Sequence, residues 1–370
     1  MDLYILVINI QMNDMLGKAA DFIKENGSKK TVIIYDTDSD GIGSAAIITK
    51  TIKRLYKKIP EALPSDHSFL FISEKMFREI KSKKFDLIII ADMAIDEKPE
   101  YVLKLAKKSK ILIIDHHQTF DNLNRYKNIL HINPSLWKIN IPSSEYCTCK
   151  LAYDICNKIT DIEDLDWVAG MGIIFDMCEK RWKSFLEGVF RKHGITREKL
   201  GEVSNILTAG YRYSGSVGAR IGYEACLESD SPLDIFGART INSKKLKRFD
   251  SVIEKEIKSI ENNWKKNAEI IEDKKLIILE LNTRFAVSSP ISTFISLKKP
   301  NYTVFVFRKK GKFTYMSLRR QDKKVNCGKI AIELTKGLEN SSGGGHIPAA
   351  GIHIMSKDWK EIRKRMLKMF

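Results

Sequence analysis

Short, isoleucine-rich runs in the first third of the chain constrain its fold more than any other sequence feature. They are four or five residues long and are bounded by charged or turn residues, as expected for strands buried on both faces of a parallel sheet. Helical periodicity separates some of them, for example over residues 45–55. Strands that alternate with helices predict an α/β domain whose ligands bind beyond the carboxyl ends of the strands. The runs are Thr31–Tyr35, Phe69–Ile72, Leu87–Ala91, Ile111–Ile114 and Ile129–Ile132.

The rest of the chain predicts a helical region followed by a second, smaller α/β domain. Residues from about 144 to 230 have mainly helical patterns, and apolar residues from Leu246 to Trp264 recur at the spacing of one long amphipathic helix. Gly311 favours a hairpin turn between the last two predicted strands. The strand patterns of this part are Leu276–Leu279, Thr303–Phe307 and Phe313–Leu318.

Composition excludes several classes of protein. Apolar residues make up 43% of the chain and charged residues 29%, which is typical of globular proteins and excludes wholesale disorder. The apolar run Leu3–Ile10 is far shorter than the roughly 20 residues of a membrane helix, and no secretory signal is recognisable. We therefore expect a cytoplasmic protein that does not contact membranes. Six cysteines without a Cys-x-x-Cys pair predict reduced thiols rather than a zinc site.

The excess of basic residues bears on the binding partner. Lys and Arg number 63 against 46 Asp and Glu, which gives a net charge of +17. Such an excess favours polyanions, namely nucleic acids, nucleotides or acidic membranes, although a lysine-rich solvated surface gives the same count. Residues 308–324 hold eight basic residues and one acidic residue, which makes them a candidate rim for a nucleic-acid groove.

Three aspartates alternate directly after the first predicted strand, namely Asp36, Asp38 and Asp40. Gly41 follows them, and a helix is expected from about residue 42. Like charges so close together repel, and a divalent cation removes the cost of burying them. A calcium hand also begins with this pattern, but it requires a preceding helix and an acidic residue at loop position 12, where this chain has Ile47. We therefore interpret the motif as part of a metal site at the edge of a sheet.

Further acids and imidazoles follow other predicted strands at the same edge. Asp92 follows the third predicted strand, and Asp115, His116 and His117 follow the fourth. Asp176 lies inside an apolar helical segment and is a further candidate, with a helix-end or capping role as the alternative. Oxygen and imidazole ligands suit Mn²⁺ or similar ions, and the set is large enough for two cations. Paired metals of this kind serve phosphoryl transfer to water.

The order of these motifs resembles that of the DHH phosphoesterases. Asp-x-Asp-x-Asp-Gly, a strand-end Asp, Asp-His-His and Gly-x-x-x-Asp follow one another as in this family. Near the C-terminus, Gly343-Gly-Gly-His346-x-Pro-Ala-Ala-Gly351 resembles the hallmark loop of the companion DHHA1 domain. The resemblance implies a DHH catalytic domain over residues 1–195, a helical connector over 196–272 and a DHHA1 substrate-binding domain over 273–370.

The resemblance also implies roles for individual residues. Asp92 would bridge two metal ions, Asp115 would orient its neighbours, and His117 would contact the scissile phosphate or assist protonation. Each substrate-binding role in the second domain has an alternative. The glycines could form only a flexible linker, and Arg319 and Arg320 could lie on a solvated strand edge. The implied ligands of the two ions, Mn²⁺ or Mg²⁺, are Asp36, Asp38, Asp40, Asp92, His116 and Asp176. The implied substrate-binding residues are Arg319, Gly343, Gly344, Gly345 and His346.

Within the family, the opening Asp36 matches the RecJ-like exonucleases, because oligonucleotide phosphatases and nanoRNases usually begin this motif with histidine. The chain resembles the compact archaeal type, which lacks the added oligonucleotide-binding barrel of bacterial RecJ. The resemblance implies a two-metal exonuclease that hydrolyses single-stranded DNA or RNA to mononucleotides in DNA repair or replication, with a GINS-type replication complex as a further partner. Three alternatives remain open: a nanoRNase or 3′-phosphoadenosine phosphate phosphatase, a non-catalytic Cdc45-like replisome component, and an inorganic pyrophosphatase.

Overall fold

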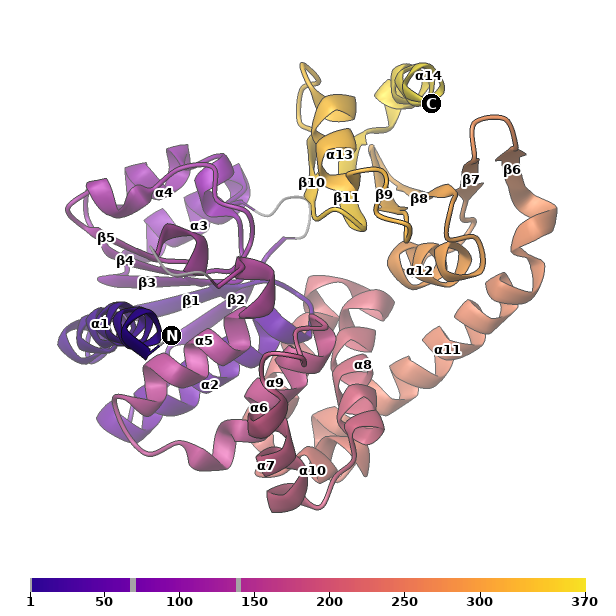
Figure 1. Cartoon of the computed structure of the whole chain (residues 1–370). Coiled ribbons are helices and arrows are strands. Elements are labelled where there is room, and N and C mark those ends of the chain that lie inside the picture. Colours follow the sequence, from indigo (N-terminus) through magenta and orange to yellow (C-terminus); the bar gives the residue numbers. More distant parts are fainter. Residues whose placement is uncertain (1, 67–70, 138–140) are drawn as a thin grey trace. The chain divides into compact units, whose positions relative to one another are not determined.

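The computed structural model describes residues 2–66, 71–137 and 141–370, with side chains described from residue 12 onward (Figure 1). These residues form two compact units, unit 1 and unit 2, which divide after Asp250. Each unit contains one β-sheet, and the helix α11 (Ile241–Asn267) runs across the boundary. A parallel sheet in the first part and a second sheet in the last part confirm the predicted α/β fold class. The division into three domains at residues 195 and 272 stays a prediction.

The sheet of unit 1 has five parallel strands in the order β2-β1-β3-β4-β5. Strands β1, β3 and β5 begin and end at the predicted residues, and β4 begins one residue earlier than predicted. Because the strands are parallel, their carboxyl ends lie at one edge of the sheet, where ligands of such sheets bind. The strands are β1 (Thr31–Tyr35), β2 (Glu61–Pro64), β3 (Leu87–Ala91), β4 (Lys110–Ile114) and β5 (Ile129–Ile132).

The predicted strand Phe69–Ile72 is wrong. Its first two residues lie outside the described residues, and its last two belong to no strand. The strand in this part of the chain is β2, which pairs with β1 at the edge of the sheet and ends in Pro64, a residue that edge strands tolerate. Periodicity alone cannot assign so short an apolar run, and here Ile72 packs in the core cluster that contains Met76 of α3.

Helices cover both faces of this sheet. In Figure 1, α1, α2 and α5 lie on one face, and α3 and α4 lie on the other. Successive strand residues point to opposite faces, so Ile33 packs in the first core and Ile34 in the second. Helices α5 to α9 confirm the helical region predicted from about residue 144. The helices are α1 (Asp2–Asn26), α2 (Ser39–Tyr56), α3 (Glu74–Lys83), α4 (Glu100–Leu105), α5 (Thr148–Asn157), α6 (Asp166–Phe175), α7 (Lys183–His193), α8 (Arg197–Ser214), α9 (Ser216–Glu228) and α10 (Pro232–Phe236).

The sheet of unit 2 has six strands in the order β10-β11-β9-β8-β7-β6. Only the β7–β8 pair is parallel among the described strands of this sheet. The predicted strands correspond to β7, β8 and β9, and Gly311 adopts φ +58° in the hairpin between the last two, as predicted. The elements are β6 (Ala268–Ile271), β7 (Leu276–Glu280), α12 (Ser288–Lys298), β8 (Thr303–Lys310), β9 (Phe313–Arg319), α13 (Cys327–Thr335), β10 (Ser342–Gly345), β11 (Ala349–Met355) and α14 (Trp359–Met369).

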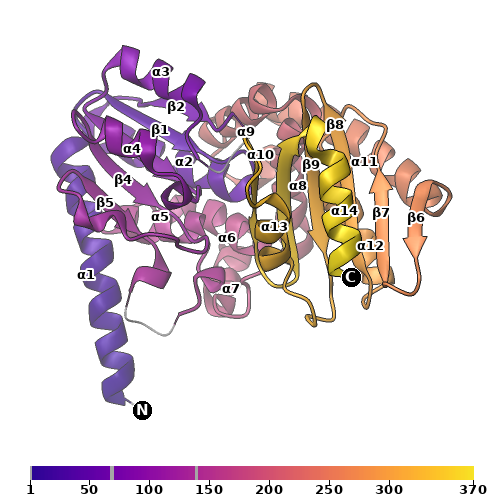
Figure 2. The same ribbon diagram turned by 90° about the horizontal axis from the view of Figure 1, so that it is seen from above.

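The predicted long amphipathic helix is confirmed as α11, which extends beyond both predicted ends. Within the parts of the chain that the structure describes, neither this helix nor any other has the length and apolar character that a membrane span requires. Figure 2 shows unit 2 from above, with α14 and α13 in front of its strands.

Candidate metal centre

The turn between β1 and α2 provides the first part of the site. Asp38 is the N-cap of α2, because its carboxylate accepts hydrogen bonds from the backbone N–H groups of Asp40 at 2.9 Å and Gly41 at 3.2 Å. This cap starts the helix at Ser39, earlier than the predicted start near residue 42. A side chain at Gly41 would meet the carbonyl oxygen of Asp36 at 2.4 Å, so the turn requires glycine.

Backbone hydrogen bonds between neighbouring strands hold three aspartates side by side. The N–H of Asp36 donates to Ala91 at 3.2 Å, that of Asp92 to Ile114 at 2.9 Å, and that of Asp115 to Ile132 at 3.0 Å. Each bond continues the sheet by one residue past the strand end. The predicted convergence of these carboxylates therefore follows from the strand register.

Asp92 has a strained backbone. Its φ of +64° lies in the left-handed region, which aspartate tolerates better than most residues but which still costs free energy. The side chain is almost completely buried, and its Oδ1 accepts a hydrogen bond of 3.0 Å from Oγ1 of Thr148. The surrounding structure thus fixes this carboxylate in one orientation.

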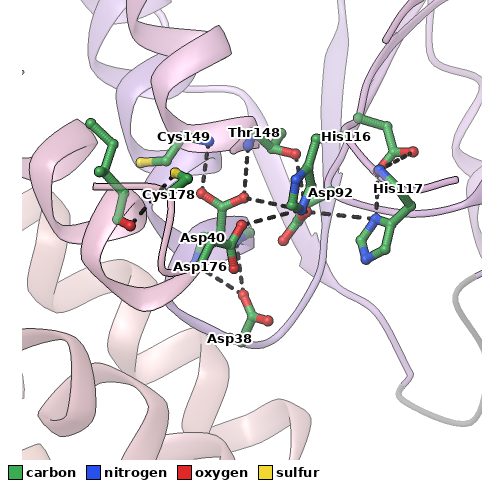
Figure 3. Close-up of polar contacts among 12 residues, drawn as sticks. Asp38, Asp40, Asp92, His116, His117, Thr148, Cys149, Asp176 and Cys178 are labelled. Atoms are coloured by element: carbon green, nitrogen blue, oxygen red, sulfur yellow. Dashed lines mark hydrogen bonds and ion pairs between the residues drawn. The ribbon is translucent and has the colours of Figure 1, made fainter. Parts of the chain in front are cut away.

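The N-terminus of α5 fixes Asp40. The N–H of Thr148 donates to Oδ2 of Asp40 and the N–H of Cys149 donates to Oδ1, both at 2.8 Å (Figure 3). The sequence analysis missed Thr148 and Cys149 as site residues. No acid, imidazole or glycine pattern marks them, and their backbone groups matter only because α5 packs against α2.

His116 lies between three carboxylates. Its Nε2 is 3.2 Å from Oδ2 of Asp176, 3.6 Å from Oδ1 of Asp92 and 3.9 Å from Oδ2 of Asp40 (Figure 3). Asp176 directly follows α6 as its C-cap residue. Asp176 is therefore a helix-end residue, as the alternative interpretation had it, and does not lie inside the helix. Its side chain nevertheless contacts His116.

Asp115 forms a buried pair with His117. Its Oδ1 lies 2.7 Å from Nδ1 of His117, and its Oδ2 accepts hydrogen bonds of 3.2 Å from the His117 backbone N–H and from Nδ2 of Asn133. Asn133 also donates to the backbone oxygen of His117 at 2.9 Å. Asp115 therefore contacts His117 directly, and its orienting role stays a prediction. Asn133 is a further residue that contacts this pair, and no sequence pattern marked it.

Three sets of possible ligand atoms gather in unit 1, and within each set the atoms lie within 4.8 Å of one another. Together they include all six residues implied as metal ligands, and Asp92 belongs to two of the sets. They also include His117 and Cys147, of which Cys147 had been predicted only as a reduced thiol. All six cysteines are free, as predicted. The sets are Asp36, Asp38 and Asp92; Asp92, His116 and His117; and Asp40, Cys147 and Asp176.

Burial and mutual repulsion disfavour charge on several of these carboxylates. Burial raises the pKa of Asp38 to about 8, with contributions from the neighbouring charges of Asp36 and Asp40. Burial and repulsion between the aspartates also raise the pKa of Asp92 and of Asp176 well above the usual range. The ionised forms of these groups need a compensating positive charge, which a divalent cation supplies. This cluster of side chains is therefore a candidate acidic metal site.

The Asp115–His117 pair shows the opposite behaviour. Burial alone would raise the pKa of Asp115, but the charge and hydrogen bond of His117 outweigh it and lower this pKa to about 2. Burial alone would lower the pKa of His117, but Asp115 outweighs it and raises this pKa to about 9. Near neutral pH the pair is therefore a carboxylate and an imidazolium.

The residues predicted to bind substrate all lie in unit 2. Arg319 ends β9, is half-buried, and donates from Nη2 to Oγ of Ser289 at 3.1 Å. The predicted glycine loop is instead strand β10, paired with β11. A side chain at Gly343 would meet the backbone oxygen of Ala331 in α13 at 2.2 Å, so close packing requires glycine there. His346 is exposed in the turn after β10.

Comparison with protein families identifies the part of the chain that carries this site. Residues 30–184 match the model of the DHH family, N-terminal domain. This segment contains β1 to β5 and every residue of the three ligand sets. This segment of the chain is therefore similar to a DHH-family N-terminal domain, in agreement with the motifs that it carries.

Individual relatives agree with this assignment. The single-stranded-DNA-specific exonuclease RecJ of Bacillus subtilis (strain 168) is 30% identical over 171 residues, which cover 44% of this chain and 21% of that protein. A solved DHH-domain structure, described as a member of the s1p family of ribosomal proteins, has a TM-score of 0.74 at 17% identity and covers 98% of this chain and 91% of its own. RecJ of Thermus thermophilus in complex with Mn²⁺ has a TM-score of 0.72 at 16% identity, with 95% and 54% covered. At these identities the solved structures show a shared fold.

Proposed function

We propose that this chain is a metal-dependent phosphodiesterase of the RecJ-like type, which hydrolyses single-stranded DNA or RNA from an end to mononucleotides. The observation that carries the proposal is the clustering of all six implied ligands. They belong to three sets of possible ligand atoms within residues 30–184, and His116 lies close to carboxylates of all three aspartates Asp40, Asp92 and Asp176. The sequence match to a single-stranded-DNA-specific exonuclease supports the choice of substrate class. The net charge of +17 supports it as well, because single strands bind along basic surfaces.

The donor atoms of the pocket fit a pair of Mn²⁺ or Mg²⁺ ions. Hard carboxylate oxygens predominate, and imidazole nitrogen completes the set, which is the combination that Mn²⁺ accepts. Asp92 belongs to two of the three ligand sets, so it is the residue that would contact both ions. When bound, such ions activate a water molecule and neutralise charge on the phosphate oxygens.

The remaining residues of the pocket position groups and hold protons. Thr148 and Cys149 keep the carboxylate of Asp40 in place. Asp115 contacts Nδ1 of His117 and favours the protonated ring, so His117 would donate a hydrogen bond to the scissile phosphate or a proton to the leaving oxygen. In unit 2, we assign substrate binding to Arg319, Gly343, Gly344, Gly345 and His346. Association with a GINS-type complex stays a prediction of the resemblance.

Digestion of end-labelled oligonucleotides tests this function. DNA and RNA strands of graded length, labelled at the 5′ or the 3′ end, are incubated with the full chain and Mn²⁺. We expect stepwise release of mononucleotides from single strands. Loss of activity is expected for Asp92→Asn, whose new side chain tolerates the positive φ, and for His116→Ala, whereas Asp273→Asn, at an exposed site, keeps full activity.

Other outcomes would select the alternatives. Activity confined to the shortest oligonucleotides or to 3′-phosphoadenosine phosphate would favour the nanoRNase or phosphatase, and release of phosphate from pyrophosphate would favour the pyrophosphatase. Absence of Mn²⁺-dependent hydrolysis on DNA, RNA and nucleotides would overturn the proposal in favour of a Cdc45-like role. Full activity of either site variant would overturn the site assignment.

A further inference from the structure

One ligand set of the candidate metal centre contains a sulfur atom. It consists of Sγ of Cys147 and one carboxylate oxygen each of Asp40 and Asp176, and the three atoms lie within 4.8 Å of one another. Cys147 is fully buried and is the N-cap residue of α5, but its side chain makes no capping hydrogen bond among the described residues. A capping role therefore does not account for this thiol beside two acids.

The helices around Cys147 fix its position relative to the two acids. The two residues that follow Cys147 donate their backbone N–H groups to Asp40, both at 2.8 Å, and the N–H of Leu151 donates to the carbonyl oxygen of Cys147 at 3.1 Å. Asp176 is the C-cap residue of α6, and α2, α5 and α6 pack on one another. The sulfur atom and both carboxylates are thus held in place by packed helices.

His116 adds a nitrogen donor to this set. Its Nε2 lies 3.2 Å from Oδ2 of Asp176 and 3.9 Å from Oδ2 of Asp40, and the three side chains point toward one another in Figure 3. Bonds of about 2.0–2.3 Å to a tetrahedral ion place neighbouring donor atoms about 3.3–3.6 Å apart. The observed distances lie close to this spacing, so small side-chain movements would let these donors hold one ion.

One of the carboxylate oxygens lacks a donor. Oδ2 of Asp176 is buried and accepts no hydrogen bond within the part of the chain that the structure describes. It faces Nε2 of His116, the nitrogen that would bind a metal ion. An ionised oxygen buried in this way is costly, and a cation between the two atoms would remove that cost.

A second thiol supports Cys147. A hydrogen bond from Cys147 lowers the pKa of the Cys178 thiol, and Cys178 is itself buried. When a metal ion replaces the proton of Cys147, that proton leaves to solvent, and the thiol of Cys178 can then donate a hydrogen bond to the metal-bound sulfur. Partners of this kind keep a metal ligand in its orientation.

Sulfur changes which ions this part of the centre prefers. Oxygen ligands suit Mg²⁺ and Mn²⁺, whereas thiolate sulfur favours softer ions such as Zn²⁺, and imidazole accepts these ions as well. Four donors of sulfur, nitrogen and oxygen are the usual surroundings of a tetrahedral Zn²⁺ ion. The set around Cys147 therefore differs in kind from the set that contains Asp36, whose three members are all aspartates.

We propose that Cys147 is a metal ligand at one of the two ion positions and makes this position selective for thiophilic divalent cations such as Zn²⁺ and Co²⁺. Its fellow ligands there are Asp40, His116 and Asp176. The other position, in the set that contains Asp36, keeps oxygen donors for Mn²⁺ or Mg²⁺. The inference rests on the metal centre of the proposed function, but it does not require hydrolysis.

Absorption spectroscopy of the metal-free full chain with Co²⁺ tests the sulfur ligand directly. A thiolate bound to Co²⁺ gives a charge-transfer band in the near ultraviolet, which oxygen and nitrogen ligands do not give. We expect this band to saturate at about one Co²⁺ per chain, to disappear when an equal amount of Zn²⁺ is added, and to persist in excess Mn²⁺. Absence of the band in the parent chain would overturn the proposal.

Two cysteine variants separate ligation from packing. Cys147→Ser should lose the band and bind Zn²⁺ at least about 10-fold more weakly in competition with a chromophoric chelator, whereas its Mn²⁺ affinity should stay within a few-fold of the parent. The matched control is Cys156→Ser, which replaces another fully buried thiol of α5, outside the ligand sets, and should keep the band. An unchanged band in Cys147→Ser, or equal losses of Zn²⁺ and Mn²⁺ affinity, would overturn the proposal.

X-ray absorption at the zinc edge keeps the test independent of how the variants fold. The parent chain loaded with one equivalent of Zn²⁺ should show one sulfur atom at about 2.3 Å from the metal, besides nitrogen and oxygen at about 2.0–2.2 Å. A shell of nitrogen and oxygen alone would overturn the proposal. Failure of the proposed function is distinguishable, because the parent would then show the cobalt–sulfur band but release no mononucleotides from any labelled strand with Mn²⁺.

Discussion

The hydroxyl group of Thr148 offers a selective way to disturb the candidate metal centre. Thr148 is fully buried, its N–H donates to Asp40, and its Oγ1 donates to Oδ1 of Asp92 at 3.0 Å. Thr148→Val has nearly the same shape and keeps the backbone hydrogen bond to Asp40. The substitution therefore removes one hydrogen bond, to the carboxylate that we expect to bridge two ions.

The expected size of the effect follows from the chemistry of this hydrogen bond. A hydrogen bond to a charged group contributes about 1.5–3 kcal/mol, and each 1.4 kcal/mol corresponds to a factor of ten in affinity. The hydroxyl group orients the charged form of Asp92, which is the form that binds metal. Thr148→Val should therefore weaken Mn²⁺ binding about 10- to 100-fold, a range that is also typical of residues that support metal ligands.

Isothermal titration calorimetry of the metal-free chain with Mn²⁺ measures this effect. Thr148→Ser serves as the control, because it keeps the hydroxyl group and should bind within a few-fold of the parent. Thermal unfolding in EDTA establishes that both variants are folded. A Kd of Thr148→Val within twofold of the parent, or an equal loss in Thr148→Ser, would refute the reasoning that this hydroxyl group positions Asp92.

Two further predictions concern pH and packing. The folded-state pKa of Asp38, about 8, lies above its unfolded value, so the folded chain binds more protons than the unfolded chain between the two values. Without metal, the free energy of unfolding should therefore fall as pH rises from about 4 to 8. Mn²⁺ binds the ionised carboxylate, so the increase in melting temperature that it causes should be larger at pH 8 than at pH 6. An equal increase at both pH values would contradict this prediction. A Cβ at Gly172 would lie 2.6 Å from Oδ1 of Asp40, so Gly172→Ala should lower the free energy of unfolding by about 1–3 kcal/mol in urea titrations and weaken Mn²⁺ binding. Gly188→Ala, with no atom near its Cβ position in α7, should raise that free energy by about 0.5–1 kcal/mol, and a loss of stability equal to that of Gly172→Ala would count against the packing argument.

Local patterns predicted most of unit 1 and the position of its acids. Isoleucine-rich runs predicted the positions of β1, β3, β4 and β5, because a strand buried on both faces needs apolar residues at every position. Parallel pairing then brings Asp36, Asp92 and Asp115 to one edge without any further information. The edge strand β2 was missed because its four residues, with a proline at the end, carry neither an apolar run nor a clear alternation.

Contacts between distant parts of the chain explain what the sequence did not reveal. Thr148 and Cys149 act on Asp40, more than 100 residues earlier, mainly through backbone groups that every residue type carries. The resemblance assigned Gly343 to a substrate-binding loop, and the structure gives it a packing role that the sequence did not reveal, because β10 packs directly against the backbone of α13. Arg308 belonged to a recognisably basic segment, yet its burial and its alignment with Tyr315 depend on the pairing of β8 with β9.

The central claim is that the carboxylates and imidazole after β1, β3, β4 and α6 together hold a pair of divalent ions. Crystals grown with Mn²⁺, with diffraction data collected at the manganese absorption edge, test it most directly. The account predicts two anomalous peaks about 3.5–4 Å apart, with Asp92 touching both and His116 touching one. Peaks elsewhere on the chain, or a pocket without manganese at saturating concentration, would contradict it.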